Sequence, residues 1–494
     1  MRVMFATSEA YPLAKTGGLA DVSRSLPAAL QRLGADIRVV MPAYPRAVLQ
    51  LREPRIAARL KSVMGVSDGL IIAGMFPDCD LQVFLISSAS LFGRAGGLYQ
   101  DDEGRDWPDN GLRFAFLSRV AADIALGRTE IGWQPELGHA NDWHTGLLPL
   151  FLAEENGPRP RTVFTTHNMA FQGSFAPDEV PQLPVKDGYD IEFYGRLSYL
   201  KAGLAYADYV TTVSPTYARE ILTPEYGFGL EGVLQMRGEK FSGILNGIDE
   251  DLWNPASDPF LITNYRVGDM AGKRLCKQAL QEELELPVPG DVPVIGFVSR
   301  LTDQKMADTL LDAVPWICEQ NVQLAVVGEG ERAIEGALKE AEARHPEKIS
   351  VTIGYDEPLA HKLQAGSDIL LAPARFEPCG LTQLYALRYG TLPVVRRTGG
   401  LADTVVDANN QSISDRTASG FIFNEPSAES MISALSRALA LYRDPLHWRL
   451  LQLQAMTRRF GWDTSAAAYM ALYEEGAANK AGGEHADAAR RAAG

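Results

Sequence analysis

Short apolar segments alternate with longer, helix-like segments along most of this chain. The apolar segments are Val3–Ala6, Ile37–Met41, Leu81–Ile86, Thr162–Thr165, Tyr209–Val213, Val294–Val298, Gln323–Val327, Ile369–Ala372 and Leu392–Val395. Uniformly apolar strands that are separated by helices are typical of parallel sheets covered by helices on both faces. We therefore expect an α/β fold.

The chain is too long for a single hydrophobic core, because it has 494 residues. Asn-Gly and Asn-Pro pairs within Asn246–Pro255 indicate a turn, and the alternation restarts near Pro293. We predict an N-terminal α/β domain at 1–250, a C-terminal one at 251–460, a helix at 461–475 that crosses back to the first domain, and a disordered tail at 476–494.

Composition and charge exclude several classes of protein. The formal net charge of −15 argues against nucleic acid or an anionic membrane as a partner. No apolar run reaches about 18 residues, so no membrane span is expected. Met1–Ala10 lacks the layout of a signal peptide, so we expect no leader or transit peptide. The four cysteines form no Cys-x-x-Cys pair, which predicts neither disulfides nor a zinc site and fits a cytoplasmic location.

A glycine-rich hexapeptide, Thr-Gly-Gly-Leu-Ala-Asp, occurs twice, at Thr16–Asp21 and at Thr398–Asp403. Each copy follows a strand-like segment and precedes a helix-like one. Reuse of a good strand-to-helix turn would explain this. Alternatively, each copy offers backbone N–H groups and a helix N-terminus to an anion, with Lys15 adding a full charge at the first copy.

Two further segments place charged groups where a strand ends and a helix begins. Arg300 and Lys305 follow the strand Val294–Val298, at the edge where open α/β sheets bind ligands, and could hold a diphosphate. Glu377 precedes Gly380, where a carboxylate could bind sugar hydroxyls beside a phosphate-binding helix start. The plainer alternatives are two surface cations and a helix-capping carboxylate.

Two polar segments follow strands of the first half. His167 and Asn168 come directly after Thr162–Thr165 and begin a hydrogen-bonding loop suited to sugar hydroxyls. A structural histidine is the alternative. Asn141-Asp-Trp-His144 either lines a site or is a capped helix start with a packed Trp.

Taken together, these segments resemble the bacterial glycogen synthases, which are similar to the plant starch synthases. The resemblance extends from Val3 to about Tyr473. Its motifs are Lys15-Thr-Gly-Gly-Leu19, His167-Asn168, Asn246-Gly-Ile-Asp249, Ser299-Arg-Leu-Thr302 with Gln304-Lys305, Glu377-Pro-Cys-Gly-Leu-Thr-Gln383 and Thr398-Gly-Gly-Leu-Ala-Asp403.

The resemblance implies the glycosyltransferase fold called GT-B, in which two Rossmann-like domains with parallel sheets face an interdomain cleft. It implies transfer of glucose from ADP-glucose to the non-reducing end of an α-1,4-glucan, either glycogen or a maltooligosaccharide. The transfer would retain the α configuration and release ADP. The choice of ADP over UDP comes from the resemblance alone.

By matching position, the resemblance also implies residue roles. The catalytic set is Glu377, Asp142, His167, Lys305 and Arg300. The ADP-glucose set is Lys15, Gly17, Gly18, His167, Asn168, Asn246, Arg300, Lys305, Cys379, Gly380, Leu381, Thr382 and Tyr385. Tyr99 and Asp142 are expected on the acceptor side.

The chain departs from the expected pattern at three positions. Asn141 stands where a His usually precedes Asp-Trp, Met306 where a Gly usually follows Gln-Lys, and Glu331 where an Asp is usual. Gly permits backbone angles that Met disfavours, so Met306 makes the geometry of the Lys305 loop uncertain. Tyr385 replaces the second of two glutamates found in related retaining enzymes, which favours the synthase branch.

We expect no cofactor and no metal. Asp-x-Asp triplets at Asp78–Asp80 and Asp249–Asp251 could hold a metal ion, but each is expected to form a turn and lacks further oxygen ligands. Two rival functions remain open at this point: a phosphorylase, which would need a pyridoxal-phosphate lysine, and a non-catalytic glucan-binding protein.

Overall fold

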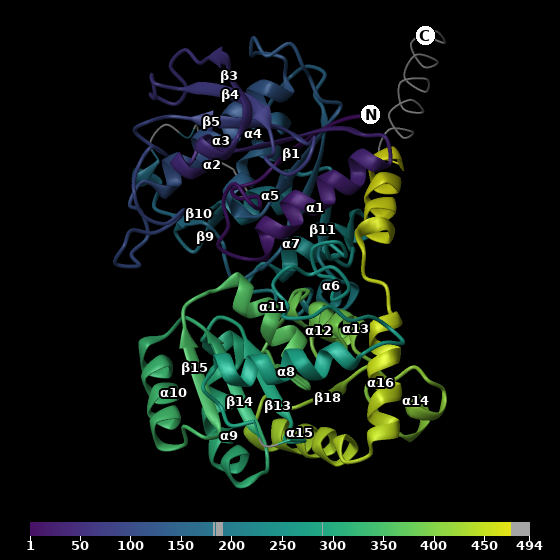
Figure 1. Cartoon of the computed structure of the whole chain (residues 1–494). Coiled ribbons are helices and arrows are strands. Elements are labelled where there is room, and N and C mark those ends of the chain that lie inside the picture. Colours follow the sequence, from purple (N-terminus) through teal and green to yellow (C-terminus); the bar gives the residue numbers. More distant parts are fainter. Residues whose placement is uncertain (181–182, 184–190, 289, 476–494) are drawn as a thin grey trace. The chain divides into compact units, whose positions relative to one another are not determined.

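The computed structural model of the chain describes residues 1–180, 183, 191–288 and 290–475. The tail predicted at 476–494 lies outside the described residues. The chain divides into two compact units (Figure 1). Unit 1 contains Met1–Gly247 and the segment that begins at Trp462, and unit 2 contains Ile248–Gly461.

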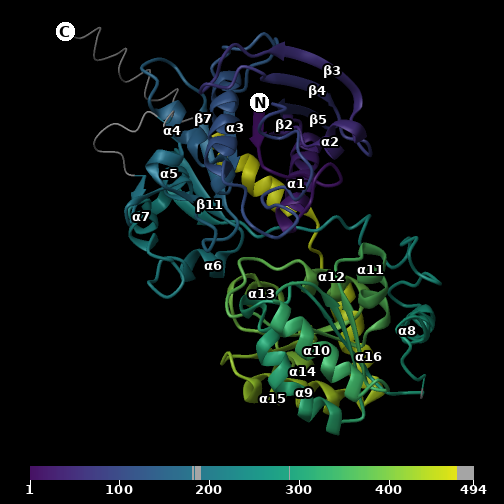
Figure 2. The same cartoon turned by 90° about the vertical axis from the view of Figure 1, so that its left-hand side faces the viewer.

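The central sheet of unit 1 has nine strands within the described residues, in the order β12-β11-β7-β6-β1-β2-β5-β4-β3. The strands are β1 (Arg2–Ala6), β2 (Asp36–Pro42), β3 (Arg52–Arg59), β4 (Leu70–Met75), β5 (Gln82–Ser87), β6 (Leu137–Asn141), β7 (Arg161–Thr166), β11 (Tyr209–Thr212) and β12 (Phe241–Gly243). All neighbours pair in parallel except at one edge, where β4 pairs antiparallel with β5 and with β3 (Figure 2).

Helices and a small sheet complete unit 1. The helices are α1 (Gly18–Arg32), α2 (Pro45–Gln50), α3 (Asn110–Ala125), α4 (Leu147–Ala153), α5 (Tyr199–Tyr206), α6 (Pro215–Glu220) and α7 (Glu231–Gln235), with short 3-10 turns at η1 (Trp143–Thr145), η2 (Pro177–Glu179) and η3 (Gly238–Lys240). The small antiparallel sheet contains β8 (Ser174–Phe175), β10 (Arg196–Ser198) and β9 (Glu192–Phe193). Helix α1 buries Leu19, Val22 and Leu26 at helical spacing.

A helix over residues 462–475 packs against the sheet of unit 1, beside α1 (Figures 1 and 2). Its buried face repeats at helical spacing through Ala466, Tyr469 and Tyr473. The Tyr473 hydroxyl lies 2.7 Å from Nδ1 of His139, a fully buried residue of β6. Burial lowers the pKa of His139 to about 3, so its ring stays neutral inside the core.

Unit 2 contains a fully parallel sheet in the order β15-β14-β13-β16-β17-β18. Its strands are β13 (Val294–Val298), β14 (Gln323–Gly328), β15 (Ile349–Ile353), β16 (Ile369–Ala372), β17 (Leu392–Arg396) and β18 (Phe421–Phe423). Its helices are α8 (Ala271–Glu283), α9 (Ala307–Glu319), α10 (Arg332–Arg344), α11 (Glu357–Gly366), α12 (Thr382–Tyr389), α13 (Gly399–Thr404), α14 (Asn410–Ser414), α15 (Ala428–Tyr442) and α16 (Pro445–Thr457), with a 3-10 turn η4 (Asp303–Lys305) before α9.

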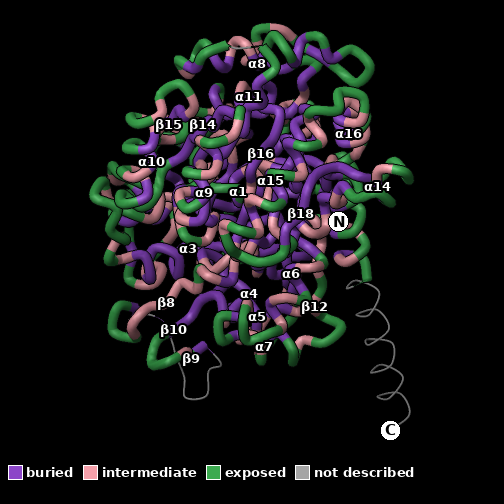
Figure 3. Tube along the Cα trace, turned by 90° about the horizontal axis from the view of Figure 1, so that it is seen from below, coloured by how far each residue is buried: buried purple, intermediate pink, exposed green. Residues whose placement is uncertain are grey.

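Both faces of the unit 2 sheet are covered by helices, and Figure 3 colours most of its strand trace as buried. On β13, Ile295 and Phe297 join one apolar cluster, whereas Val294 joins another. This double burial explains why the strand is apolar at successive positions rather than at alternate ones. The predicted α/β class, with parallel sheets in two units, is therefore confirmed.

No helix in the described part of the chain combines the length and the apolar character that crossing a membrane requires.

Met306, where the family resemblance leads one to expect glycine, lies in the turn between η4 and α9 and has a left-handed backbone conformation. Met306 has φ 53° and ψ 35° and is fully buried. A non-glycine residue in this conformation costs about 1–2 kcal/mol. The Met306 side chain packs into the core of unit 2, and this burial, which glycine could not supply, offsets the cost.

Substitutions at Met306 should reveal this strain. Both Met306→Gly and Met306→Ala lose the buried side chain, at a cost of about 2–5 kcal/mol. Glycine, however, relieves the left-handed strain, so we expect Met306→Gly to be more stable than Met306→Ala by about 1 kcal/mol. Chemical denaturation measures both free energies of unfolding. Ala307→Gly, in the first turn of α9, is the control and should show the opposite preference, for Ala over Gly. A more stable Ala variant at position 306 would contradict the strain.

Candidate functional site

The polar edge of unit 2 is formed by loops that follow β13, β16 and β17. The strand order changes direction between β13 and β16, since β14 lies on one side of β13 and β16 on the other. Such switch points are where open α/β sheets bind ligands. Arg300 and Lys305 follow β13, and Glu377 follows β16. The Lys305 ammonium donates a hydrogen bond to the largely buried Glu377 carboxylate, so the two predicted donor-binding groups form an ion pair.

The loops after β13 and β16 are also joined through Gln304. The side-chain amide of Gln304 donates to the Phe376 carbonyl at 3.3 Å, and the backbone carbonyl of Gln304 accepts from the Arg375 backbone N–H at 2.9 Å. The Arg300 guanidinium lies 3.4 Å from the Gln304 side-chain oxygen. Arg375 forms two hydrogen bonds to Asp308 of α9, at 2.9 and 2.7 Å. Hydrogen bonds therefore fix the two loops that carry Lys305 and Glu377 relative to each other.

Glu331, the third departure, supports the same region. It precedes α10, and its carboxylate accepts from the Asp303 backbone N–H at 3.2 Å. Its backbone N–H donates to the Leu301 carbonyl at 2.9 Å. A glutamate at this position thus holds the loop that carries Arg300 and Lys305.

The start of α12 is built for close backbone approach. Gly380 has φ +73°, and the Gln383 side chain donates to the carbonyls of Cys379 and Gly380 at 3.1 and 3.0 Å. A Cβ on Gly400 would lie 2.2 Å from the Cys379 carbonyl oxygen, so only glycine lets α13 approach this turn. Leu381 and Thr382 follow at the first turn of α12, where backbone N–H groups lack helical partners.

Tyr385 of α12 lies in an aromatic stack. Its ring packs on Trp253 at a centroid distance of 3.7 Å, and the other face of Trp253 packs on His361, also at 3.7 Å. Asp258 accepts hydrogen bonds from His361 Nδ1 at 2.8 Å and from the Tyr389 hydroxyl at 2.5 Å. This buried stack fixes the orientation of α12.

The polar edge of unit 1 begins with the turn after β1. Lys15 forms an ion pair with Asp21 at 2.9 Å, and Gly17 and Gly18 are exposed at the start of α1. The buried carboxylate of Glu9 accepts from the Thr16 N–H at 2.5 Å and from its hydroxyl at 2.9 Å. Burial raises the pKa of Glu9 to about 7. Glu9 therefore sets the conformation of the glycine turn.

Asp142 and His167 meet where β6 and β7 end. The His167 backbone N–H donates to the Asp142 carboxylate at 2.6 Å, and His167 Nε2 lies 3.1 Å from the Asn141 side-chain oxygen. Asp142 has φ 56° and ψ 177°, backbone angles that are otherwise almost confined to glycine, so its conformation is strained. Burial raises the pKa of Asp142 to about 7 and lowers that of His167 to about 3. A neutral imidazole thus lies beside a carboxyl group that titrates near neutrality.

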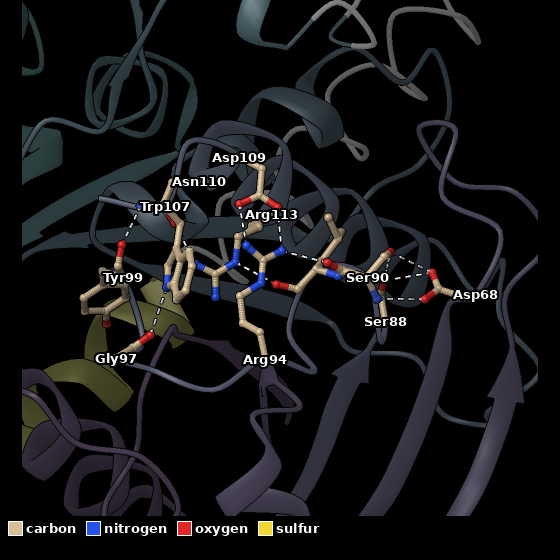
Figure 4. A network of polar contacts seen from close by, with 11 residues as sticks. Asp68, Ser88, Ser90, Arg94, Gly97, Tyr99, Trp107, Asp109, Asn110 and Arg113 are labelled. Carbon is tan, nitrogen blue, oxygen red and sulfur yellow. Dashed lines mark hydrogen bonds and ion pairs between the residues drawn. The ribbon is translucent and has the colours of Figure 1, made fainter. Parts of the chain in front are cut away.

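Tyr99 belongs to the loop between β5 and α3, which a polar network holds in place (Figure 4). Its hydroxyl lies 2.7 Å from the Ser8 hydroxyl at the end of β1, and its ring stacks on His144 at 4.5 Å. The contacts drawn in Figure 4 include Arg94 to Asp109, Asn110 to the Tyr99 carbonyl, Trp107 to the Gly97 carbonyl, and Ser88 and Ser90 to Asp68. Tyr99 is thereby fixed beside the loop that follows β1.

Two asparagines complete the predicted set. Asn246 is 5% exposed, and its side-chain oxygen has no hydrogen-bond partner in the described part of the chain. A buried acceptor without a partner is costly and is often found at ligand sites. Asn168 instead closes its own turn, because its side-chain oxygen accepts from the Ala170 N–H at 3.0 Å.

The structure thus brings the predicted residues together as two polar edges, one in each unit. Unit 2 gathers Arg300, Lys305, Glu377, Cys379, Gly380, Leu381 and Thr382, while unit 1 gathers Lys15, Gly17, Gly18, Tyr99, Asp142, His167 and Asn168. Sequence reasoning missed Glu9, Trp253 and Arg375. The sequence did offer a signal for two of them: Glu9 is a charged residue in an apolar stretch after β1, and Trp253 is a large aromatic residue in a turn.

The Asp-x-Asp triplets are engaged by the protein itself. Asp78 pairs with Arg24 at 2.8 Å and Asp80 with Arg52 at 2.9 Å. Asp249 accepts from the N–H groups of the two residues after Glu250, at 3.0 and 3.1 Å, and closes a turn. Within the residues that the structure describes, no group of three or more candidate metal ligands occurs.

Comparison with known proteins gives matches over nearly the whole chain. Residues 2–236 match the family model of the starch synthase catalytic domain, and residues 281–449 match that of the group 1 glycosyl transferases. A glycogen synthase of Burkholderia thailandensis is 49% identical over 95% of this chain and 90% of that protein. A glycogen synthase of Paramagnetospirillum magneticum is 46% identical over 98% of this chain and 99% of that protein.

Solved structures show the same relationship. The catalytic domain of starch synthase IV from Arabidopsis thaliana, solved with ADP and acarbose, is 33% identical, with a TM-score of 0.85 over 96% of this chain and 98% of that one. A sucrose-phosphate synthase from Thermosynechococcus elongatus shares the fold, at 18% identity and a TM-score of 0.59 over 97% of this chain and 99% of that one. The predicted GT-B fold is confirmed.

The family resemblance inferred from the motifs is likewise confirmed, and the chain is a glycosyltransferase that belongs to the bacterial glycogen synthases.

Proposed function

We propose that this enzyme transfers glucose from ADP-glucose to the non-reducing end of an α-1,4-glucan, with retention of the α configuration and release of ADP. The observation that carries the proposal is the ion pair of Lys305 and Glu377 at the switch point of unit 2, directly before the open start of α12. A cation, a carboxylate and the backbone N–H groups of a helix's first turn match a ligand that joins a sugar to a diphosphate.

The donor's diphosphate would bind to Arg300, Lys305 and the first turn of α12. These groups would neutralise the charge that develops on the departing ADP, an effect typically worth several kcal/mol of barrier. Lys15 and the glycine turn of unit 1 would also serve the donor, because a cation and a helix start suit an anion. No step then requires a metal ion.

The glucose would bind to Glu377 through its hydroxyls. In unit 1, His167 and Asp142 would contact the transferred glucose and the reaction centre, and Tyr99 the acceptor glucan. Asn246, with its unpartnered buried oxygen, is suited to accept a hydrogen bond from donor or glucan. Tyr385 would contact the ADP part, held by its stacking on Trp253.

Retention without an obvious covalent nucleophile favours attack from the same face that ADP leaves. The acceptor hydroxyl would form the new bond to the anomeric carbon while the bond to the diphosphate oxygen breaks. That oxygen would take the hydroxyl proton, so charge balances without a glycosyl-enzyme. We place this reaction in the cytoplasm, where the four free thiols would remain reduced.

A direct assay tests the function. Purified enzyme with ADP-glucose and glycogen should release ADP and lengthen the glucan, and should use UDP-glucose far less well. A chelator should not abolish activity, and the new linkage should be α by nuclear magnetic resonance. Absence of ADP release would instead favour a glucan-binding protein, and absorbance of bound pyridoxal phosphate would favour a phosphorylase.

The ion pair of unit 2 predicts a non-additive pair of variants. Lys305→Ala and Glu377→Ala should each lower kcat about 100-fold or more, because each removes a donor contact and leaves its partner unpaired. The fold reduction in kcat of the double variant should be much smaller than the product of the two single reductions. Lys362→Ala, which breaks an exposed ion pair with Glu283, is the matched control and should keep near-normal kcat. Additive losses would contradict a shared function.

The titration of Asp142 predicts a pH dependence. Because burial raises its pKa from 3.8 to about 7, the stability that it contributes is fully present below pH 3.8 and is lost as pH rises through 7. Asp142→Asn keeps the oxygen that accepts from His167 but removes the charge. The thermal midpoint of the wild type should therefore fall relative to that of Asp142→Asn between pH 5 and pH 8. A difference that stays constant over this range would refute the raised pKa.

A further inference from the structure

Asn141 is the last residue of β6 and is fully buried at the switch point of unit 1, where β1 lies between β2 and β6. Its backbone is fixed on both sides by Thr145: the Asn141 N–H donates to the Thr145 hydroxyl at 2.7 Å, and that hydroxyl lies 2.8 Å from the Asn141 carbonyl. The position of the Asn141 backbone, from which the side chain extends, is therefore fixed.

The orientation of the Asn141 amide follows from its neighbour on β1. The side-chain nitrogen lies 3.1 Å from the carbonyl oxygen of Ala6, which can only accept a hydrogen bond. The NH₂ group must face this carbonyl, so the side-chain oxygen must face the other way, toward His167. That oxygen lies 3.1 Å from His167 Nε2.

This orientation determines which ring nitrogen of His167 carries the proton. An amide oxygen can only accept, so Nε2 must be the N–H donor. Burial keeps the ring neutral, with a pKa of about 3, so Nδ1 then carries a lone pair and no proton. Among the described residues, the hydrogen bond of the His167 ring is made through Nε2, not Nδ1. The backbone of His167 is held independently by Asp142.

We propose that Asn141 is a positioning residue that holds His167 in the Nε2-protonated form, leaving Nδ1 to accept a hydrogen bond from a hydroxyl of the transferred glucose. The part that concerns glucose rests on the proposed function, because His167 enters the reaction only through that sugar. The part that concerns the tautomer rests on Ala6, Asn141 and His167 alone. Asn141 touches no substrate in this role and acts through the imidazole.

Three variants separate this role from a merely structural one. Asn141→Leu has a similar size but offers neither donor nor acceptor, so the Nε2 proton loses its partner. Asn141→Asp loses the bond to Ala6 but keeps an acceptor toward His167, and should preserve the tautomer. Thr145→Val disturbs the backbone of the same turn and leaves the amide in place, so it is the matched structural control.

The tautomer is measured by nuclear magnetic resonance on ligand-free enzyme labelled with ¹⁵N-histidine. The chain has seven histidines, and His167→Gln identifies the signals of His167. We expect Nε2–H in the wild type, in Asn141→Asp and in Thr145→Val, and a mixture or Nδ1–H in Asn141→Leu. Nδ1–H in the wild type overturns the proposal without any variant, and so does a well-folded Asn141→Leu that keeps pure Nε2–H.

Kinetics test the second half of the proposal. Loss of one hydrogen bond to the reacting sugar should lower kcat of Asn141→Leu about 10- to 100-fold. The KM for ADP-glucose should change little, because the diphosphate contacts remain. Thr145→Val should not show this combination of a lower kcat and an unchanged KM. A lower kcat in Asn141→Leu with an unchanged tautomer would contradict the mechanism. A wild type that is inactive with ADP-glucose but has Nε2–H would overturn the proposed function while upholding the tautomer.

Discussion

The parallel pairing of β13 with β16 is the constraint on which the polar edge of unit 2 depends. The register Ile295↔Ile369 and Gly296↔Leu370 sets the loops after the two strands side by side, so Lys305 and Glu377 meet although 72 positions separate them. Gly296 is part of this constraint. A Cβ there would lie 2.4 Å from the Ser367 hydroxyl and 2.5 Å from the Leu363 side chain, so glycine lets α11 pack closely beneath the site.

Charge at both edges is arranged in pairs. Lys15 has Asp21, Lys305 has Glu377, and Arg375 has Asp308. In a chain of net charge −15, such pairs keep the cations ordered without creating a large positive surface. If the donor binds as proposed, its diphosphate would have to compete with the protein's own carboxylates for these cations.

The nine buried strands could be predicted because apolar runs and turn residues are local signals, and all of them are found in the structure. The edge strand β3 lacked such a signal, since it contains three arginines and a glutamate and most of it is exposed. The positions of the candidate site residues after β1, β6, β7, β13 and β16 could be predicted because parallel strands end at one sheet edge. Glu9 was missed because its contact with Thr16 forms only once the turn has folded. Trp253 was missed because its partners, the rings of His361 and Tyr385, are distant in sequence.

The helix at 462–475 has a consequence for how the protein is made. Unit 2 is continuous in sequence, whereas unit 1 needs Tyr469 and Tyr473 to cover the buried His139 of its central sheet. A ribosome delivers these residues after all of unit 2. Synthesis of unit 1 begins first, but the sheet around His139 lacks these two rings until unit 2 has been made.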